Sequence, residues 1–103
     1  MPKAYWIARV DVTDAEPYKL YAQRLDPVIA QFGGRFLVRA GQSETVEGAS
    51  RSRNVVIEFP SYEAAQACYR SPEYAPLITL RQTCADVDIV IAEGYDAPQP
   101  GGQ

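Results

Sequence analysis

Residues 54–80 read NVVIEFPSYEAAQACYRSPEYAPLITL, and this stretch decides the fold because regular structure starts and stops in it twice. Its β-branched opening predicts a strand over Val55–Phe59, which the following proline ends. Ser61 can then cap a helix, since a serine hydroxyl accepts hydrogen bonds from the unpaired N–H groups at a helix start. Ser71 and the proline after it repeat this arrangement, so a second helical segment is expected from Pro72 to about Thr83.

Hydrophobic periodicity predicts the remaining elements, because apolar residues alternate along strands and recur at intervals of three and four along helices. In chain order, these elements are a strand at Ala4–Val12, a helix that begins at Thr13 with Glu16 in a capping box and ends at Gly33-Gly34, a strand at Arg35–Ala40, a helix at Tyr62–Tyr69, and a strand at Asp86–Gly94. Residues 41–53 are polar, which predicts a loop. We expect one domain over residues 1–95 and a disordered tail, rich in proline and glycine, over residues 96–103.

The element order strand, helix, strand, strand, helix, strand is that of an α+β protein with the ferredoxin-like split βαβ fold. In this fold, helices cover one face of a four-stranded antiparallel sheet. A sheet with one solvent-exposed face should alternate apolar and polar residues. Here the first, third and fourth strands are apolar on both faces. Since the helices can cover only one face, we expect a second copy of the chain to cover the other, which predicts a homodimer.

Composition argues against several classes of protein. The net charge is −3 at pH 7 and the basic residues are scattered, so nucleic acid is not an expected partner. No apolar run approaches the length of a membrane span, and the N-terminus lacks a secretory signal pattern, so we expect no membrane contact and a cytoplasmic location. Cys68 and Cys84 are then expected to be reduced and buried. Histidine is absent, and we predict neither a metal nor a cofactor.

Three motifs carry a resemblance to a known family. They are Gly33–Gly41 (GGRFLVRAG), Val55–Ser61 (VVIEFPS) and Tyr69–Tyr74 (YRSPEY). In this order they resemble the domain-of-unknown-function family 1330, a member of the dimeric α/β-barrel group, and the resemblance runs from about Ala4 to Glu93. It implies that two copies of the sheet form a dimeric α/β barrel. The family has no established activity, so the resemblance implies no catalytic residue.

Glu58 is the first candidate for a functional residue, because a carboxylate inside an apolar strand must be paired, hydrogen-bonded or protonated. Its expected partners are Arg39 or Arg35 on the preceding strand, or Arg9 on the first strand, and we predict a pair with Arg39. That pair could be purely structural, which we favour because structural ion pairs also perturb pKa values. The alternative is that Glu58 serves as a general base or as an anchor for a ligand.

Several aromatic residues could line a cavity between the sheet and the helices, where their polar groups would orient a small ligand, or could simply form the core. These residues are Tyr5, Trp6, Tyr69 and Tyr74. Arg39 is the expected anchor for a ligand carboxylate, since its planar guanidinium matches two oxygens.

Three functions remain open. The first is a small homodimeric domain that binds a small, partly apolar or carboxylated molecule in a pocket between sheet and helices. The second is a cofactor-independent enzyme, such as a monooxygenase or an isomerase, by analogy with other dimeric α/β barrels. The third is a structural or interaction domain with a filled core.

Overall fold

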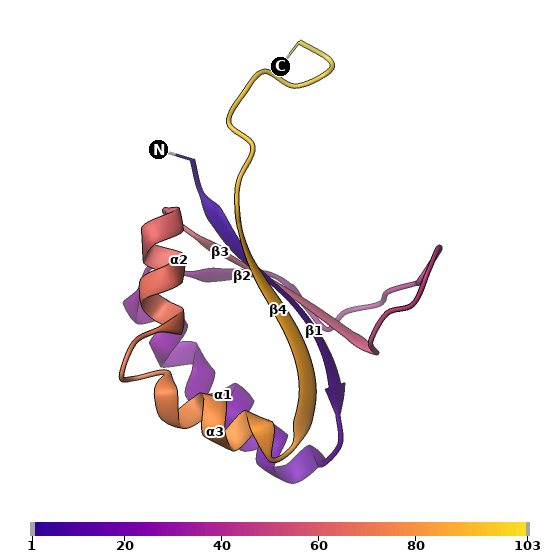
Figure 1. Cartoon of the computed structure of the whole chain (residues 1–103), viewed down its shortest axis with the longest axis vertical. Helices are drawn as coiled ribbons and strands as arrows, with labels where there is room; N and C mark the ends of the chain where they lie inside the picture. The colour runs from indigo at the N-terminus through magenta and orange to yellow at the C-terminus, as the bar shows by residue number, and fades with distance from the viewer. Residues whose placement is uncertain (1, 103) are drawn as a thin grey trace.

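A computed structural model describes residues 2–102, and these form one sheet and three helices in the order βαββααβ (Figure 1). The strands are β1 (Ala4–Val12), β2 (Arg35–Arg39), β3 (Arg53–Phe59) and β4 (Ala85–Glu93). Within the described residues they make a four-stranded sheet in the order β2-β3-β1-β4, and every pair is antiparallel. The predicted ferredoxin-like α+β fold is confirmed.

The helices α1 (Ala15–Gln31), α2 (Tyr62–Tyr69) and α3 (Ala75–Gln82) lie on one face of the sheet (Figure 1). The helix α2 packs against β1, β3 and β4, whereas α1 and α3 pack mainly against each other. The predicted cap of α2 is present, because Ser61 Oγ accepts a hydrogen bond of 3.0 Å from the Ala64 N–H. In residues 2–102, no helix has the length and apolar character that a membrane crossing requires.

Two predicted helix starts are wrong. The segment expected to be helical from Pro72 begins as an α-helix only at Ala75. Ser71 instead closes a turn, in which its Oγ accepts from the Tyr74 N–H at 3.1 Å and donates to the Cys68 carbonyl at 2.8 Å. The capping box at Thr13 is also absent, because Asp14 occupies the cap position of α1 and its side chain makes no capping hydrogen bond.

Trp6 is the centre of the core. Even-numbered side chains of β1 point toward the helices, and Trp6 is 2% exposed. Its ring lies 5.2 Å from the rings of both Phe59 and Tyr74 and 5.7 Å from that of Tyr69, measured between ring centroids. Its indole N–H donates to the Ala65 carbonyl at 2.9 Å. A buried tryptophan needs such a partner, so this bond fixes α2 against the sheet.

Odd-numbered side chains of β1 lie on the opposite side, which we call the open sheet face. Ile7 pairs with Val56 on one neighbouring strand and with Val90 on the other. Ile7 is 40% exposed and Val90 is 59% exposed, although both are large and apolar. The other apolar members of the open sheet face are Tyr5, Val38 and Ala92. Apolar residues therefore occupy both faces of the sheet, as the strand sequences predict.

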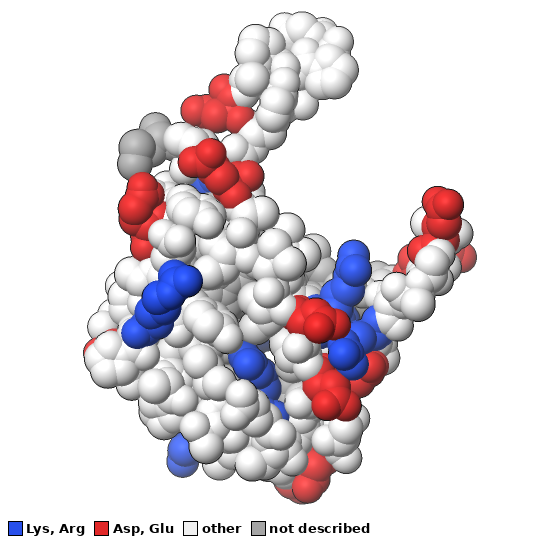
Figure 2. Space-filling view, in the orientation of Figure 1, with Lys and Arg blue, Asp and Glu red and all other residues white. Residues whose placement is uncertain are grey.

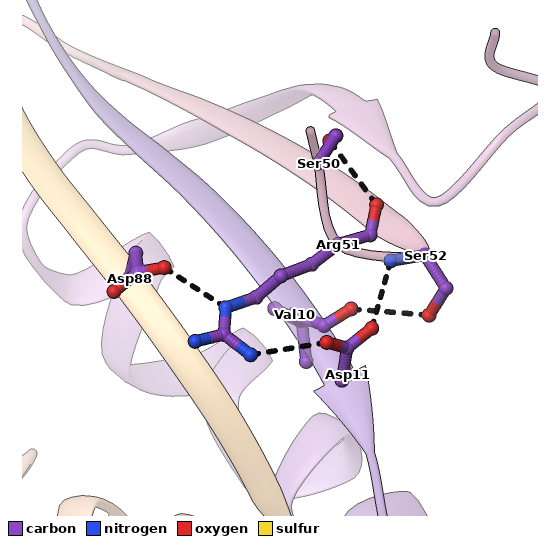
Figure 3. A network of polar contacts seen from close by, with 6 residues as sticks. All are labelled: Val10, Asp11, Ser50, Arg51, Ser52 and Asp88. Carbon is purple, nitrogen blue, oxygen red and sulfur yellow. Dashed lines mark hydrogen bonds and ion pairs between the residues drawn. The ribbon is translucent and has the colours of Figure 1, made fainter. Parts of the chain in front are cut away.

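Residues 40–52, which we call the arm, project from the ends of β2 and β3 away from the helices (Figure 1). A polar network fixes the base of the arm to the sheet (Figure 3). Arg51 donates from Nε to Asp88 at 2.9 Å and from Nη1 to Asp11 at 3.0 Å, and the Ser52 N–H donates to Asp11 at 2.9 Å. The Ser52 N–H, together with Arg51, lowers the pKa of Asp11. The base of the arm is thus held by charged hydrogen bonds to β1 and β4.

A substitution at Gly34 would test how tightly the end of α1 packs on the sheet. A Cβ at this position would lie 2.7 Å from Ile29 Cγ2 and 2.8 Å from Phe59 Cε1, so both neighbours would have to move. Gly34→Ala should therefore destabilise the fold by about 1–3 kcal/mol, the usual cost of overpacking a core. Gly41→Ala is the control, because nothing lies within 4 Å of its added Cβ. Thermal melts of the two variants measure the difference, and equal melting temperatures would contradict this packing.

Candidate functional site

A cavity of about 70 Å³ lies between the sheet and the helices α1 and α3. One water molecule needs about 10–15 Å³ of such space, so the cavity has room for several waters or for a small organic molecule. Side chains from every strand form its floor, and most of them are apolar or aromatic. The lining residues are Trp6, Ala8, Val10, Tyr18, Tyr21, Ala22, Leu25, Phe36, Arg39, Ala40, Arg53, Val55, Ile57, Tyr74, Arg81, Val87 and Ile89.

Three polar side chains meet in the wall of this apolar cavity, and we call them the Tyr–Arg cluster. The hydroxyls of Tyr21 and Tyr74 are hydrogen-bonded at 2.7 Å, and Arg81 Nη1 donates to the Tyr74 hydroxyl at 2.8 Å. All three residues are buried, with Arg81 only 7% exposed. The Arg81 Nε is buried and has no hydrogen-bond partner among the described residues. The cluster therefore contributes a buried positive charge to the wall of the cavity.

The local sequence explains how the Tyr–Arg cluster is assembled. Tyr74 precedes α3 directly, and Arg81 follows it by seven residues, in the last turn of that helix. A spacing of seven is about two helical turns, so both side chains lie on the same side of α3 as the buried Leu77. Tyr21 comes from the facing side of α1, which packs against α3.

Two tyrosines of the cavity, Tyr74 and Tyr18, remain protonated. Burial is the main cause that raises the pKa of Tyr74, and the neighbouring Tyr21 raises it further, although Arg81 opposes both. Burial also raises the pKa of Tyr18. Since an ordinary phenol already titrates near pH 10, neither group is a phenolate at neutral pH. The Arg81 charge is therefore not neutralised by a tyrosine.

Two further arginines stand where the cavity meets solvent. Arg39 is exposed, its guanidinium lies 3.9 Å from the centroid of the Phe36 ring, and its Nη2 is 2.7 Å from Asp26. Arg53 is also exposed and lies 5.4 Å from the centroid of the Tyr18 ring. Figure 2 shows positively charged atoms in the hollow between the helices and the sheet, surrounded by uncharged atoms. The rim of the cavity is therefore positively charged, although the chain as a whole is negative.

The structure divides the predicted site residues between two faces of the sheet. Tyr74 and Arg39 both line the cavity. Tyr69 lies beside Tyr74, with ring centroids 5.5 Å apart, but is not part of the lining. Tyr5 and Glu58 lie together on the open sheet face, where the Tyr5 hydroxyl donates to Glu58 at 3.4 Å. These five residues therefore do not form a single site.

Glu58 does not pair with Arg39, and this prediction is wrong. The Glu58 carboxylate is 3.0 Å from Arg35 Nε and 3.3 Å from Lys3 Nζ. The reason is an irregularity in β2 between Phe36 and Val38, which adds one residue and reverses the alternation of side chains beyond it. Arg35 is consequently on the open sheet face and Arg39 on the helix-covered face.

Burial raises the pKa of Glu58, but hydrogen bonds and attraction from Lys3 and Arg35 outweigh it, so the net shift is downward. Two basic partners therefore hold the Glu58 carboxylate in its charged form.

Arg81 lines the cavity but is not among the site residues predicted from the sequence. The signal was present, because a charged residue at a spacing of seven from Tyr74 and four from Leu77 falls on the apolar side of the helix.

The two cysteines are free and buried. Burial raises the pKa of Cys68 to about 12 and also raises that of Cys84, so both are thiols at neutral pH. Residues 2–102 contain no group of three or more side chains suited to hold a metal ion.

The fold and the cavity define a small ferredoxin-like α+β domain with an internal polar cluster. A family model for "Domain of unknown function (DUF1330)" matches residues 3–95, and the chain belongs to this family. The resemblance that the sequence motifs indicate is thereby confirmed. No curated protein that was compared with the chain matches it.

Several solved structures have the same fold. A protein of unknown function from Rhodopseudomonas palustris is 18% identical, with 93% of this chain and 85% of that chain covered and a TM-score of 0.75. SnoaB, a cofactor-independent oxygenase from Streptomyces nogalater, is 17% identical, with 96% of each chain covered and a TM-score of 0.57. A dimeric protein of unknown function with a ferredoxin-like fold, from Bacteroides fragilis, is 11% identical, with 88% of this chain and 95% of that chain covered and a TM-score of 0.52. These identities are low, so the likeness shows the fold alone.

The Glu58 ion pairs predict a specific titration. Arg35→Met should raise the pKa of Glu58 by removing one of its two basic partners, whereas Arg39→Met should leave it unchanged, because Arg39 lies on the other face. Since the folded pKa is below the ordinary value of 4.5, this carboxylate stabilises the fold above that pH, and the stabilisation is lost as the pH falls through the folded pKa. A carboxyl-carbon NMR titration measures the shift. An equal response to both substitutions would contradict the assignment.

Proposed function

We propose that the protein is a homodimeric domain that binds a small, partly apolar molecule in the cavity between the sheet and the helices. One observation carries the proposal, namely an apolar and aromatic cavity with three converging polar side chains in its wall. Small-molecule sites commonly combine an apolar lining with a few placed polar groups. A filled core would leave no such space.

Binding is proposed here in preference to turnover. The ionisable side chains of the lining are tyrosines and arginines. General bases are most often histidines or carboxylates, and the lining includes neither. Glu58, the carboxylate considered as a general base, lies on the opposite face of the sheet. These residues suit recognition of a ligand and its orientation.

The homodimer part of the proposal rests on the open sheet face. Ile7, Val38 and Val90 form a continuous apolar surface there, and each is at least 40% exposed. An exposed apolar surface of this kind commonly marks an interface between proteins. A second copy related by a two-fold axis would present the same face and cover it. The Bacteroides fragilis protein with this fold is described as dimeric, which agrees with the proposal.

We also propose that the dimer works in the cytoplasm. Both cysteines are free, and no disulfide contributes to the described part of the chain. Reduced thiols of this kind are typical of proteins in a reducing compartment.

The dimer can be tested with two matched substitutions. Val90→Asp places a charge in the open sheet face, so the variant should sediment as a folded monomer at micromolar concentration, where the wild-type protein should be a dimer. Leu20→Asp is the control, since Leu20 is also an exposed apolar residue but lies on α1. The control should remain dimeric. A monomeric wild-type protein, or a Val90→Asp variant that is still a dimer, would contradict the proposed interface.

Ligand binding can be tested through the cavity itself. Trp6 is the only tryptophan in the sequence and lines the cavity, so its indole fluorescence and N–H resonance should respond to single-ring compounds that bind there. Ala22→Leu should abolish this response by filling the cavity, because Ala22 belongs to the lining. Ala30→Leu should preserve it, since Ala30 is an exposed residue of the same helix. A wild-type protein that responds to none of these compounds would support a filled core instead.

A further inference from the structure

We propose that Arg81 is the receptor for a carboxylate, and that the ligand of the cavity is a compact apolar monocarboxylate with one ring or a short branched chain. This inference rests on the proposed function, since it names the class of molecule that the cavity would bind. It assigns the carboxylate to the Tyr–Arg cluster and the apolar part of the molecule to the surrounding aliphatic and aromatic lining.

Arg81 is buried without a counter-ion among the described residues. In residues 2–102, none of the ion pairs involves Arg81, and its Nε lacks a hydrogen-bond partner. A guanidinium carries donors in a planar fork that matches the two oxygens of a carboxylate. Burial of a charge is costly unless that charge is paired and hydrogen-bonded. The two tyrosine hydroxyls supply one hydrogen bond and no charge, so an anion would provide the counter-charge that the guanidinium lacks.

The interior of the cavity carries a positive charge that its own lining does not neutralise. Arg81 contributes one positive charge to the interior, and the described lining residues include no carboxylate to neutralise it. A monoanion would cancel that charge in the interior, whereas a phosphate dianion would need a second positive charge there, and the other arginines of the lining, Arg39 and Arg53, are exposed at the rim. The volume of about 70 Å³ also favours a small molecule. Charge and size together select a monocarboxylate over a phosphate ester.

The arginines at the rim of the cavity would favour the approach of an anionic ligand. Arg39 and Arg53 stand at the rim of the cavity, and only Arg39 has a carboxylate partner among the described residues. Positive charge at an opening concentrates anions there, and salt screens this effect over a distance of about 8–10 Å at moderate ionic strength. The rim therefore favours anions over neutral compounds of the same shape.

The test compares benzoate with benzamide, a neutral compound of the same shape, by titration calorimetry and by the fluorescence of Trp6. Wild-type protein should bind benzoate about ten- to a hundred-fold more tightly, as expected for hydrogen bonds to a charged group. Arg81→Met should remove most of this preference, leaving only the part due to the rim arginines, while retaining weak binding of both compounds. Arg24→Met is the matched control, since Arg24 is exposed on α1 and does not line the cavity, and it should keep the wild-type preference.

Two further measurements keep the test decisive if Arg81→Met fails to fold. Tyr21→Phe removes one hydroxyl of the cluster and retains the ring, so the variant should fold and bind benzoate several-fold more weakly. In wild-type protein, salt should weaken the binding of benzoate and leave that of benzamide unchanged. Equal affinity for the two compounds would overturn the assignment of the carboxylate and leave the cavity site intact. Binding of neither compound would overturn both this inference and the proposed function.

Discussion

The sheet carries apolar side chains on both of its faces, while the helices of the described chain all pack on one of them. On the helix-covered face, Trp6 packs against Phe59 and Tyr74 and is fixed by its hydrogen bond to the Ala65 carbonyl. On the opposite face, Ile7 and Val90 remain partly exposed. Burial of apolar surface is the main favourable term in folding and association. The proposed homodimer follows from this constraint, since a second copy offers the same uncovered surface.

The way in which the three helices pack on one face of the sheet also accounts for the cavity. The short helix α2 lies directly on the sheet, but α1 and α3 pack mainly against each other and stand away from it. The space left under them is where Tyr21, Tyr74 and Arg81 meet. A buried arginine without a counter-ion lowers the stability of a core, and the proposed recognition of an anion would offset this cost. The proposed ligand would supply the missing charge and hydrogen bond.

The fold could be predicted from the sequence because its signals are local. The alternation in β1 separates Trp6 from Ile7, and the serine at position 61 caps α2 as its type and position predict. The site could not be predicted to the same extent, because it depends on geometry that is not local. The irregularity in β2 turns Arg39 away from Glu58, and a regular strand would have kept Arg35 and Arg39 on one face. The spacing of Arg81 from Tyr74 and Leu77 does place it on the apolar side of α3, but only the packing of α1 against α3 brings Tyr21 into the same cluster.

The central claim is that the guanidinium of Arg81 receives the carboxylate of a ligand within the cavity, and the Nε–H resonance of Arg81 reports on it most directly. This N–H belongs to the guanidinium that would pair with the carboxylate, so benzoate should shift its proton signal. Benzamide at equal occupancy should cause a much smaller change. If benzoate binds while the Arg81 Nε–H signal stays unchanged, the carboxylate is held elsewhere and the central claim is contradicted.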